Sequence, residues 1–244
     1  MNSIVALSLS DLSAGYGPTV IVEEVTLQLE LGSCLAILGR NGVGKSTLLR
    51  TIMGMTRVHA GRVLLGEQDL ADLPVYRRSR AGLGFVPQER EVFKSLTVQE
   101  NLRIAQRPGH WNLSTVCALF PRLAERRDNL CSQLSGGEQQ MLAIARALVG
   151  NPTVLLMDEP SEGLAPVIVD QVFDALARIR ARRDMAIVLV EQHASLALEF
   201  SEQAVVMDRG RIVHAGPSSD LRDDPDRLAQ IMGLSHEPLR THSE

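Results

Sequence analysis

Apolar and polar residues alternate with a period of two at positions 25–31. This alternation predicts a β-strand that buries one face. Residues 34–38 form an unbroken apolar run, which predicts a parallel strand buried on both faces. A helix is expected to begin at Lys45 and to end near Gly54, and a β-hairpin is expected around residues 61–66.

The pattern changes in the middle of the chain. Residues 89–134 are polar and helix-prone, and Pro108 and Pro121 interrupt them. We interpret this stretch as a helical sub-lobe inserted into a single α/β domain over residues 1–244, whose core is formed by 1–88 and 135–244.

The α/β pattern resumes after residue 135. Apolar residues at helical spacing alternate there with short apolar runs, an order that favours a parallel sheet. The expected elements are a helix over 141–149, a strand over 153–157, a helix after Pro166, a strand over 186–190, a hairpin over 204–215 that turns at Arg209-Gly210, and a short helix after Asp220.

Composition narrows the possible classes of protein. The chain has 244 residues, of which 45% are hydrophobic, which is typical of a soluble globular domain. A net charge of −4 and 3% aromatic residues argue against a nucleic-acid binder. The three cysteines form no CxxC pair, a signal peptide is not expected, and no apolar run reaches the ~20 residues that span a bilayer.

The strongest chemical signal is the sequence GRNGVGKS at positions 39–46. It matches GxxxxGK[ST] and lies between an expected strand and an expected helix, where the backbone N–H groups of such a loop bind phosphates. The alternative is a tight glycine turn with an exposed lysine. The nucleotide-binding residues expected here are Gly39, Arg40, Asn41, Gly42, Val43, Gly44, Lys45, Ser46 and Thr47.

Two carboxylates follow the apolar residues 153–157. The carboxyl ends of parallel strands are where α/β sheets bind ligands. Asp158 is expected to hold Mg²⁺, and Glu159 is expected to polarise the water that attacks the nucleotide. Alone, such a pair would by default be a solvated strand end, but together with the glycine loop it is a strong signal.

A second glycine-containing segment is Ser135-Gly136-Gly137-Glu138. Ser135 and Glu138 fit a capping box for the next helix, but a capping box does not explain two glycines in its first turn. Exposed backbone at a helix start can also bind phosphate. Two such segments in one chain suggest that ATP is held between two protomers.

In this order, the glycine loop, the LSGG segment and the apolar strand ending in Asp-Glu resemble the ATP-binding subunits of ABC transporters. The resemblance implies a P-loop NTPase (RecA-like) α/β core with an antiparallel β subdomain and an inserted α-helical subdomain. It also implies that Tyr16 stacks on adenine, that Gln88 contacts Mg²⁺ and the water, and that His193 contacts the γ-phosphate. The catalytic residues are then Lys45, Gln88, Glu159 and His193, the metal ligands are Ser46, Gln88 and Asp158, and Ser135, Gly136, Gly137 and Glu138 contact the nucleotide of the facing protomer.

Several sequence segments around these motifs resemble those of the ATPases of branched-chain amino acid importers. Residues 158–166, with Ala165 where the family often has Asp, fit that group, as do 90–93, 96–102 and 135–148. The ATPases of urea and short-amide importers share much of the pattern. A soluble non-transport ATPase of the same family, a non-hydrolysing scaffold, a GTPase (although no NKxD-type motif is found) and an exporter subunit are the alternatives.

The resemblance also implies cofactors and partners. ATP and Mg²⁺ are the expected cofactors. The expected partners are transmembrane permease subunits, a second ATPase subunit (a paralogous chain or a second copy) and, indirectly, a solute-binding protein, with no nucleic acid. The chain is expected at the cytoplasmic face of the membrane as a peripheral subunit that is soluble when purified alone. The transported solute and the composition of the dimer stay open.

Overall fold

The computed structural model describes residues 4–233, which form two β-sheets with helices around them. An antiparallel sheet has the strand order β2-β1-β4-β5. A second sheet has the order β10-β9-β3-β8-β7-β6, in which only β10 runs antiparallel to its neighbour. The strands are β1 (Val5–Tyr16), β2 (Thr19–Glu30), β3 (Cys34–Leu38), β4 (Arg57–Leu65), β5 (Gln68–Asp69), β6 (Leu83–Val86), β7 (Val154–Asp158), β8 (Ala186–Val190), β9 (Gln203–Asp208) and β10 (Arg211–Pro217).

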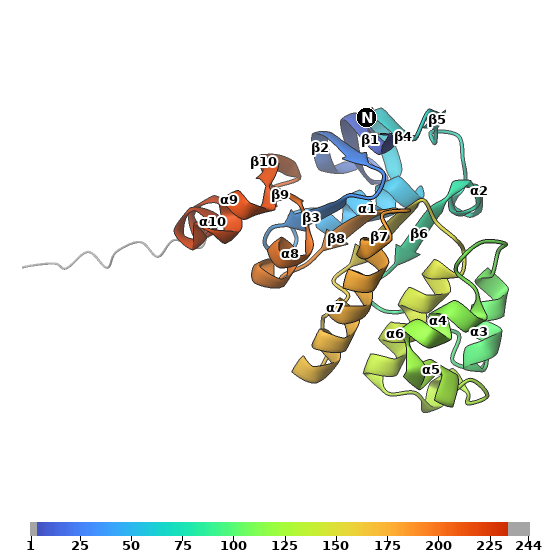
Figure 1. Cartoon of the computed structure of the whole chain (residues 1–244). Helices are drawn as coiled ribbons and strands as arrows, with labels where there is room; N and C mark the ends of the chain where they lie inside the picture. Colours follow the sequence, from blue (N-terminus) through green and yellow to red (C-terminus); the bar gives the residue numbers. More distant parts are fainter. Residues whose placement is uncertain (1–3, 234–244) are drawn as a thin grey trace, which may run out of the picture.

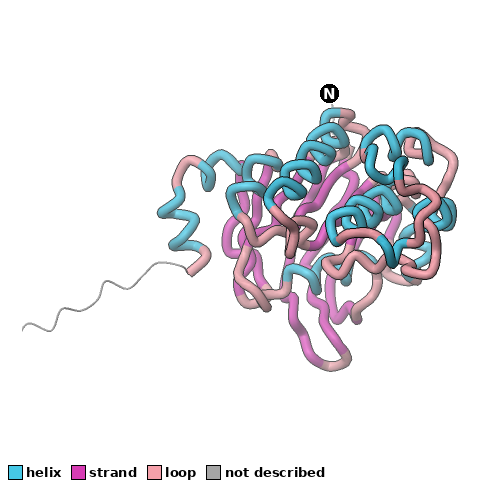
Figure 2. The backbone as a smooth tube through the Cα atoms, turned by 90° about the horizontal axis from the view of Figure 1, so that it is seen from below, coloured by secondary structure: helices cyan, strands magenta, loops and turns pink. Residues whose placement is uncertain are grey.

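Helices pack around the parallel strands and also form a group of their own. Figure 1 shows α3, α4, α5 and α6 gathered on one side of the molecule, away from β1, β2 and β4. Figure 2 shows most of the helices on one side of the strands. The helices are α1 (Lys45–Met53), α2 (Val75–Ala81), α3 (Val98–Ala105), α4 (Leu113–Leu119), α5 (Pro121–Glu125), a 3-10 turn (Cys131–Gln133), α6 (Gly136–Leu148), α7 (Pro166–Ala181), α8 (Ala194–Phe200), α9 (Ser218–Arg222) and α10 (Pro225–Ile231).

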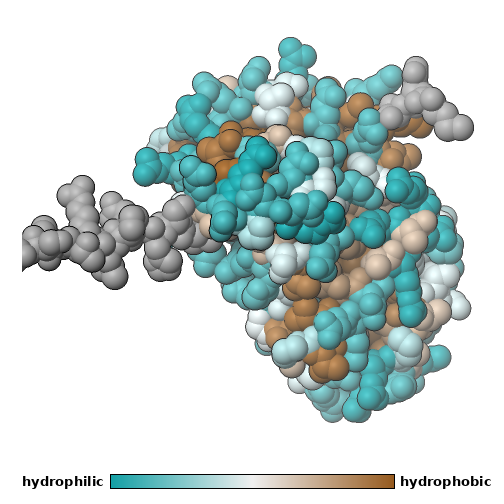
Figure 3. All heavy atoms as spheres, turned by 60° about the vertical axis from the view of Figure 1, so that its left-hand side comes forward, coloured by the Kyte–Doolittle hydropathy of each residue, from teal (hydrophilic) through white to brown (hydrophobic). Residues whose placement is uncertain are grey.

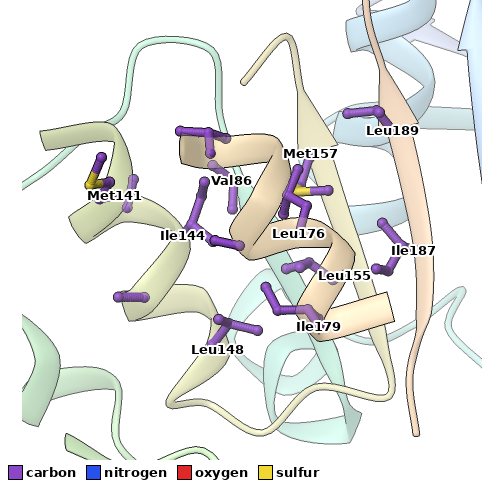
Figure 4. Packing of buried hydrophobic residues seen from close by; sticks show 14 of the residues in the cluster. Val86, Met141, Ile144, Leu148, Leu155, Met157, Leu176, Ile179, Ile187 and Leu189 are labelled. Atoms are coloured by element: carbon purple, nitrogen blue, oxygen red, sulfur yellow. The ribbon is translucent and has the colours of Figure 1, made fainter. Parts of the chain in front are cut away.

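The central strands are buried on both faces because successive residues point into two separate cores. Ala36 and Leu38 belong to the core that contains α6 and α7, whereas Leu35 and Ile37 belong to the core that contains α1 and the antiparallel sheet. Figure 4 shows part of the first core, in which Ile144 of α6 and other apolar side chains of α6 and α7 pack over β7 and β8.

Most of the elements expected from the sequence are confirmed. The strand at 34–38, the helix that begins at Lys45, the strand at 186–190 and the hairpin that turns at Arg209-Gly210 are present. The α/β fold with an antiparallel sheet is confirmed as well. The tail helix is present as α9 and α10, and the end of the expected tail, residues 234–244, lies outside the described residues.

The hairpin expected around residues 61–66 is present as β4 and β5, but Gly61 is not part of its turn. Gly61 lies inside β4 with φ 81°, where the pairing of β4 with β1 shifts register. A Cβ atom at Gly61 would lie 2.4 Å from the carbonyl oxygen of Asp11, so glycine here permits close approach of two strands. The turn itself follows β4, at Gly66-Glu67.

The surface of the described residues is mostly hydrophilic on the face shown in Figure 3. Hydrophobic residues appear there in smaller groups. Among residues 4–233, no helix is both long enough and apolar enough to span a membrane.

Candidate active site

The carboxyl ends of β3, β8, β7 and β6 meet at one edge of the parallel sheet, because these strands are neighbours in this order. This is the edge at which α/β sheets bind ligands. A hollow of about 300 Å³ opens there. Its lining residues are Ile21, Asn41, Gly42, Gly44, Lys45, Ser46, Thr47, Gln88, Glu159, Glu162 and Gln192.

The glycine loop leads from β3 directly into α1. Gly44 is the N-cap of α1 with φ 108°, and no side chain caps the helix, so its first N–H groups face the hollow. Gly39 has φ 148°, and a Cβ atom there would lie 2.5 Å from the carbonyl oxygen of Met207. The loop therefore needs glycine both for its conformation and for its contact with β9.

Lys45 is held inside the loop rather than extended into solvent. Its side chain is 4% exposed, and its Nζ donates hydrogen bonds to the carbonyl oxygens of Gly39 (2.9 Å) and Arg40 (3.0 Å). The same Nζ lies 3.7 Å from Oε1 of Glu159. A positive charge is thus fixed in the lining of the hollow, where an anionic phosphate would meet it.

Asp158, the last residue of β7, fits a magnesium ligand. The hydroxyl of Ser46 donates a hydrogen bond of 2.9 Å to its Oδ1. Its Oδ2 is buried and has no hydrogen-bond partner among residues 4–233. Burial raises the pKa of Asp158 to about 6. A buried carboxylate oxygen without a donor, beside a hydroxyl, matches the hard oxygen ligands that Mg²⁺ prefers.

The donor set also indicates how Mg²⁺ would be shared with a nucleotide. Among the described residues, no three His, Cys, Asp or Glu side chains are arranged to hold a metal ion. Mg²⁺ at such sites is bound by one or two protein oxygens together with the phosphates of the substrate. Ser46 and Asp158 suit that arrangement.

Glu159 is surrounded by donors. Its φ of 48° is rare for a non-glycine residue, and its backbone N–H donates to the carbonyl of Val190 in the neighbouring strand (2.9 Å). Its Oε2 accepts hydrogen bonds from Nε2 of Gln192 (2.6 Å) and from Nε2 of Gln88 (3.4 Å). The carboxylate is therefore oriented by two amides and by Lys45 on its other oxygen.

Glu162 is a functional candidate that sequence reasoning did not identify. It lines the hollow, and its Oε2 accepts a hydrogen bond from Nε2 of Gln88. The signal was present in the sequence, because Glu162 follows Glu159 by three residues in the segment that departs from the common family pattern. Only the fold shows that its carboxylate faces Gln88.

The structure places Gln192, and not His193, at the hollow. His193 is exposed, is absent from the lining residues, and is the N-cap of α8, where its carbonyl accepts the N–H of Ala197 (3.2 Å). Gln192 lines the hollow and donates to Glu159. The resemblance assigns His193 to the γ-phosphate, but the side chain that reaches the hollow is that of the preceding residue, Gln192.

Ser135 and Glu138 form the expected capping box of α6. The backbone N–H of Glu138 donates to Oγ of Ser135 (3.3 Å), and the backbone N–H of Ser135 donates to Oε2 of Glu138 (2.8 Å). A Cβ at Gly136 would lie 2.9 Å from Arg90 Nη1, and one at Gly137 would lie 2.6 Å from a side-chain carbon of Ile168. Packing against Ile168 thus gives Gly137 a structural reason, whereas the flexible end of the Arg90 side chain can move away from a Cβ atom at Gly136.

The four residues 135–138 do not line the hollow that contains Lys45. Tyr16 does not line it either; this side chain at the end of β1 is 46% exposed. Tyr16 instead lies near Arg50 of α1 and raises the pKa of that guanidinium. The chain alone therefore brings together the glycine loop, Gln88, Asp158 and Glu159, but neither Tyr16 nor 135–138.

Comparisons with known proteins agree on one family. The profile of the family described as "ABC transporter" matches residues 22–162. The chain is 38% identical over 224 residues to the high-affinity branched-chain amino acid transport ATP-binding protein BraG of Pseudomonas aeruginosa, covering 90% of this chain and 96% of that protein. It is 37% identical over 228 residues to the probable branched-chain amino acid transport ATP-binding protein LivF of Archaeoglobus fulgidus, covering 91% of this chain and 97% of that protein.

Solved structures share the fold. A nucleotide-free ATP-binding cassette from an ABC transporter superposes with a TM-score of 0.80 at 24% identity, covering 96% of this chain and 100% of that chain.

Proposed function

This chain belongs to the ABC transporter family as an ATP-binding and ATP-hydrolysing subunit, and from that premise we propose that it powers the import of branched-chain amino acids. The similarity to BraG and LivF, which extends over nearly the whole of each protein, supports this substrate class. The observation that carries the catalytic part is the hollow lined by Lys45, Ser46 and Glu159 at the end of the parallel sheet, with Asp158 hydrogen-bonded to Ser46.

ATP hydrolysis here is transfer of the γ-phosphoryl group to water. The N–H groups at the start of α1 and the ammonium of Lys45 hold the phosphates. Glu159 accepts a proton from the attacking water, and Gln88 orients that water. Mg²⁺, held by Ser46, Asp158 and Gln88, would neutralise charge on the phosphates when bound.

We assign residues 135–138 to the nucleotide of a facing protomer. Their helix start lies outside the hollow that contains Lys45, and the exposed Ser135 sits at the N-terminus of α6. Two ATP molecules would then each be bound by the glycine loop of one subunit and by Ser135, Gly136, Gly137 and Glu138 of the other, with Tyr16 stacking on adenine. Binding would close the dimer, and hydrolysis would reopen it.

A groove of about 560 Å³ supports docking of a permease segment. It runs between the parallel-sheet core and α3, and its exposed apolar side chains include Met55, Phe93 and Ile104. Arg80 and Arg107 also line it, so the docked segment should combine apolar residues with acidic ones. Pro87 lines the groove as well, directly before Gln88, so a segment bound here would press on the loop that reaches the ATP site.

The remaining partners are proposed from the family to which the chain belongs. We infer a peripheral position at the cytoplasmic face of the membrane, where the permease would hold the chain. A solute-binding protein would deliver the amino acid on the opposite face. The second ATPase is proposed to be a related chain in the cell.

The catalytic proposal is tested by comparing ATP turnover of the chain with that of Glu159→Gln. Loss of a general base should lower turnover by roughly 10²-fold or more, while ATP binding persists. Size-exclusion chromatography in MgATP should show a dimer for the variant. Equal turnover of the two proteins would contradict the role of Glu159.

The transport proposal is tested in the source organism. Deleting the gene should lower uptake of labelled leucine, and the wild-type gene, but not the Glu159→Gln gene, should restore it. Uptake of labelled urea is the control for the competing substrate class. A deletion that lowers urea uptake and leaves leucine uptake intact would contradict the proposal.

A further inference from the structure

The ends of β7 and β8 place two side chains in direct contact. These strands are parallel neighbours, and the backbone N–H of Glu159 donates to the carbonyl of Val190 (2.9 Å). Gln192, two residues after Val190, directs its amide toward β7, and its Nε2 lies 2.6 Å from Oε2 of Glu159. This is the shorter of the two side-chain hydrogen bonds that Glu159 accepts, because the bond from Gln88 measures 3.4 Å.

A buried carboxylate fixes the backbone that carries Gln192. Glu191 is 1% exposed, and its side chain accepts the N–H of Ser161 (3.0 Å) and the N–H of Gln192 itself (3.2 Å). Two backbone N–H groups from adjacent strand ends are thus bound to one side chain. Since successive side chains point in different directions at the end of a strand, this anchor directs residue 192 toward the site.

The next residue has a different environment. His193 begins α8 as its N-cap, makes no side-chain capping bond and is exposed. Its side chain is absent both from the hollow that contains Lys45 and from the adjoining hollow lined by Gly39, Arg40, Asn41, Gln192 and Met232. Gln192, and not His193, therefore lines both hollows.

We propose that Gln192 is the residue at the end of β8 that positions the carboxylate of Glu159, and that His193 takes no part in the reaction. This inference rests on the proposed role of Glu159 as the general base. The amide of Gln192 holds Oε2 and so directs the carboxylate toward the attacking water.

The chemistry of an amide suits this role. A charge-assisted hydrogen bond to a carboxylate is stronger and more directional than a neutral one. The amide is uncharged, so it orients Glu159 without adding a second positive charge beside Lys45. Such a charge would make the carboxylate of Glu159 a weaker base. An amide also keeps the same protonation state throughout the physiological pH range, which a histidine does not.

The test compares substitutions at two adjacent positions. Gln192→Met keeps an unbranched side chain and removes the donor. We expect its kcat to fall about 10- to 100-fold, the effect of losing one charge-assisted hydrogen bond, while KM for ATP and the affinity for a non-hydrolysable ATP analogue change less than twofold. Gln192→His restores an N–H donor and should recover much of the lost kcat. His193→Ala should keep the kcat of the parent.

Each outcome separates this inference from the function on which it rests. Full activity of Gln192→Met beside an inactive Glu159→Gln would overturn the role of Gln192 and leave the base in place. Loss of ATP affinity in Gln192→Met, a slow His193→Ala, or a Gln192→His as slow as Gln192→Met would also overturn it. Full activity of Glu159→Gln would overturn the assignment of the base, and this inference with it.

Discussion

The hydroxyl of Ser46 donates a hydrogen bond of 2.9 Å to the carboxylate of Asp158, and this bond joins the first turn of α1 to the end of β7. The bond uses one oxygen of Asp158 and leaves the other buried without a donor among residues 4–233. The pair therefore has both a fixed geometry and an unused ligand oxygen. This is the arrangement that the proposed Mg²⁺ site requires.

Asp158→Asn should weaken the use of Mg²⁺ more than the binding of ATP. The amide lacks the negative charge that attracts a divalent cation, so the Mg²⁺ concentration for half-maximal turnover should rise about tenfold or more, equivalent to at least one charge-assisted contact. ATP affinity measured in EDTA should stay within about twofold of the parent, because the contacts of Lys45 and of α1 with the phosphates remain.

Asp208 offers a matched control for this measurement. It also ends a parallel strand, β9, but its side chain is exposed. Asp208→Asn should leave the Mg²⁺ dependence unchanged. An unchanged Mg²⁺ dependence in Asp158→Asn would contradict the assignment of Asp158 as a metal ligand.

Glu162→Ala should lower kcat and leave KM for ATP nearly unchanged. The carboxylate accepts a hydrogen bond from Gln88, so its removal frees an amide that is proposed to orient the attacking water. A loss of about 3- to 10-fold is expected for an exposed charge-assisted hydrogen bond. Steady-state turnover at saturating MgATP measures it, and Glu67→Ala, at an exposed turn, is the control. Faster turnover in Glu162→Ala would show instead that Glu162 restrains Gln88.

The sequence predicts the parts of this site that are local in the chain. The loop 39–46 and the pair Asp158-Glu159 each combine a short motif with a neighbouring strand, so periodicity and spacing are sufficient to find them. Gln192 could not be found in this way, and the spacing of Glu162 from Glu159 does not show that its carboxylate faces Gln88. Which of two adjacent side chains reaches Glu159 depends on the anchor from Glu191 to Ser161, a contact across 30 positions.

Gly136 and Gly137, at the start of α6, are a second case in which the fold adds a reason that the sequence does not show. From the sequence, their presence in a first helical turn points only to bound phosphate. In the fold, Ile168 approaches Gly137 so closely that a Cβ atom there would require a shift, whereas at Gly136 only the flexible end of the Arg90 side chain would have to move. Both neighbours are distant in sequence, so this steric requirement becomes visible only when the parts are assembled.

The side chain of Asn151, which follows α6, forms hydrogen bonds with the loop after α3. Asn151→Ala should therefore destabilise the fold. Its Nδ2 donates to the carbonyls of Trp111 (2.8 Å) and Arg107 (3.1 Å), and its Oδ1 accepts the N–H of Trp111 (2.8 Å). Its φ of 51° also disfavours alanine. The free energy of unfolding should fall by about 3 kcal/mol, and the melting temperature by about 6–12 °C for a chain of this size.

Asn151→Gly separates the two causes. Glycine accepts the positive φ but makes no side-chain hydrogen bonds, so it should recover only the part of the loss that comes from backbone strain, about 1 kcal/mol. Thermal unfolding followed by circular dichroism measures both variants. A glycine variant as stable as the parent would show that the hydrogen bonds contribute nothing.

The three cysteines should differ in their reaction with a thiol reagent, because the thiolate is the reactive form. Cys34 and Cys131 are buried, and Cys117 is partly exposed. Burial raises the pKa of Cys34 to about 12, and the nearby carboxylate of Glu202 adds to the effect. Compared with a thiol of ordinary pKa, the thiolate population at pH 8 is then smaller by roughly a thousandfold.

In the folded protein one thiol per chain, that of Cys117, should react with Ellman's reagent, although slowly, because partial burial raises its pKa as well. After unfolding in guanidinium chloride, all three should react at similar rates, because the burial that separates them is lost. Cys117→Ser should remove the reaction in the folded state and leave two thiols after unfolding. A fast thiol that persists in folded Cys117→Ser would mean that the core around Cys34 or Cys131 opens readily, contrary to the burial of both residues in it.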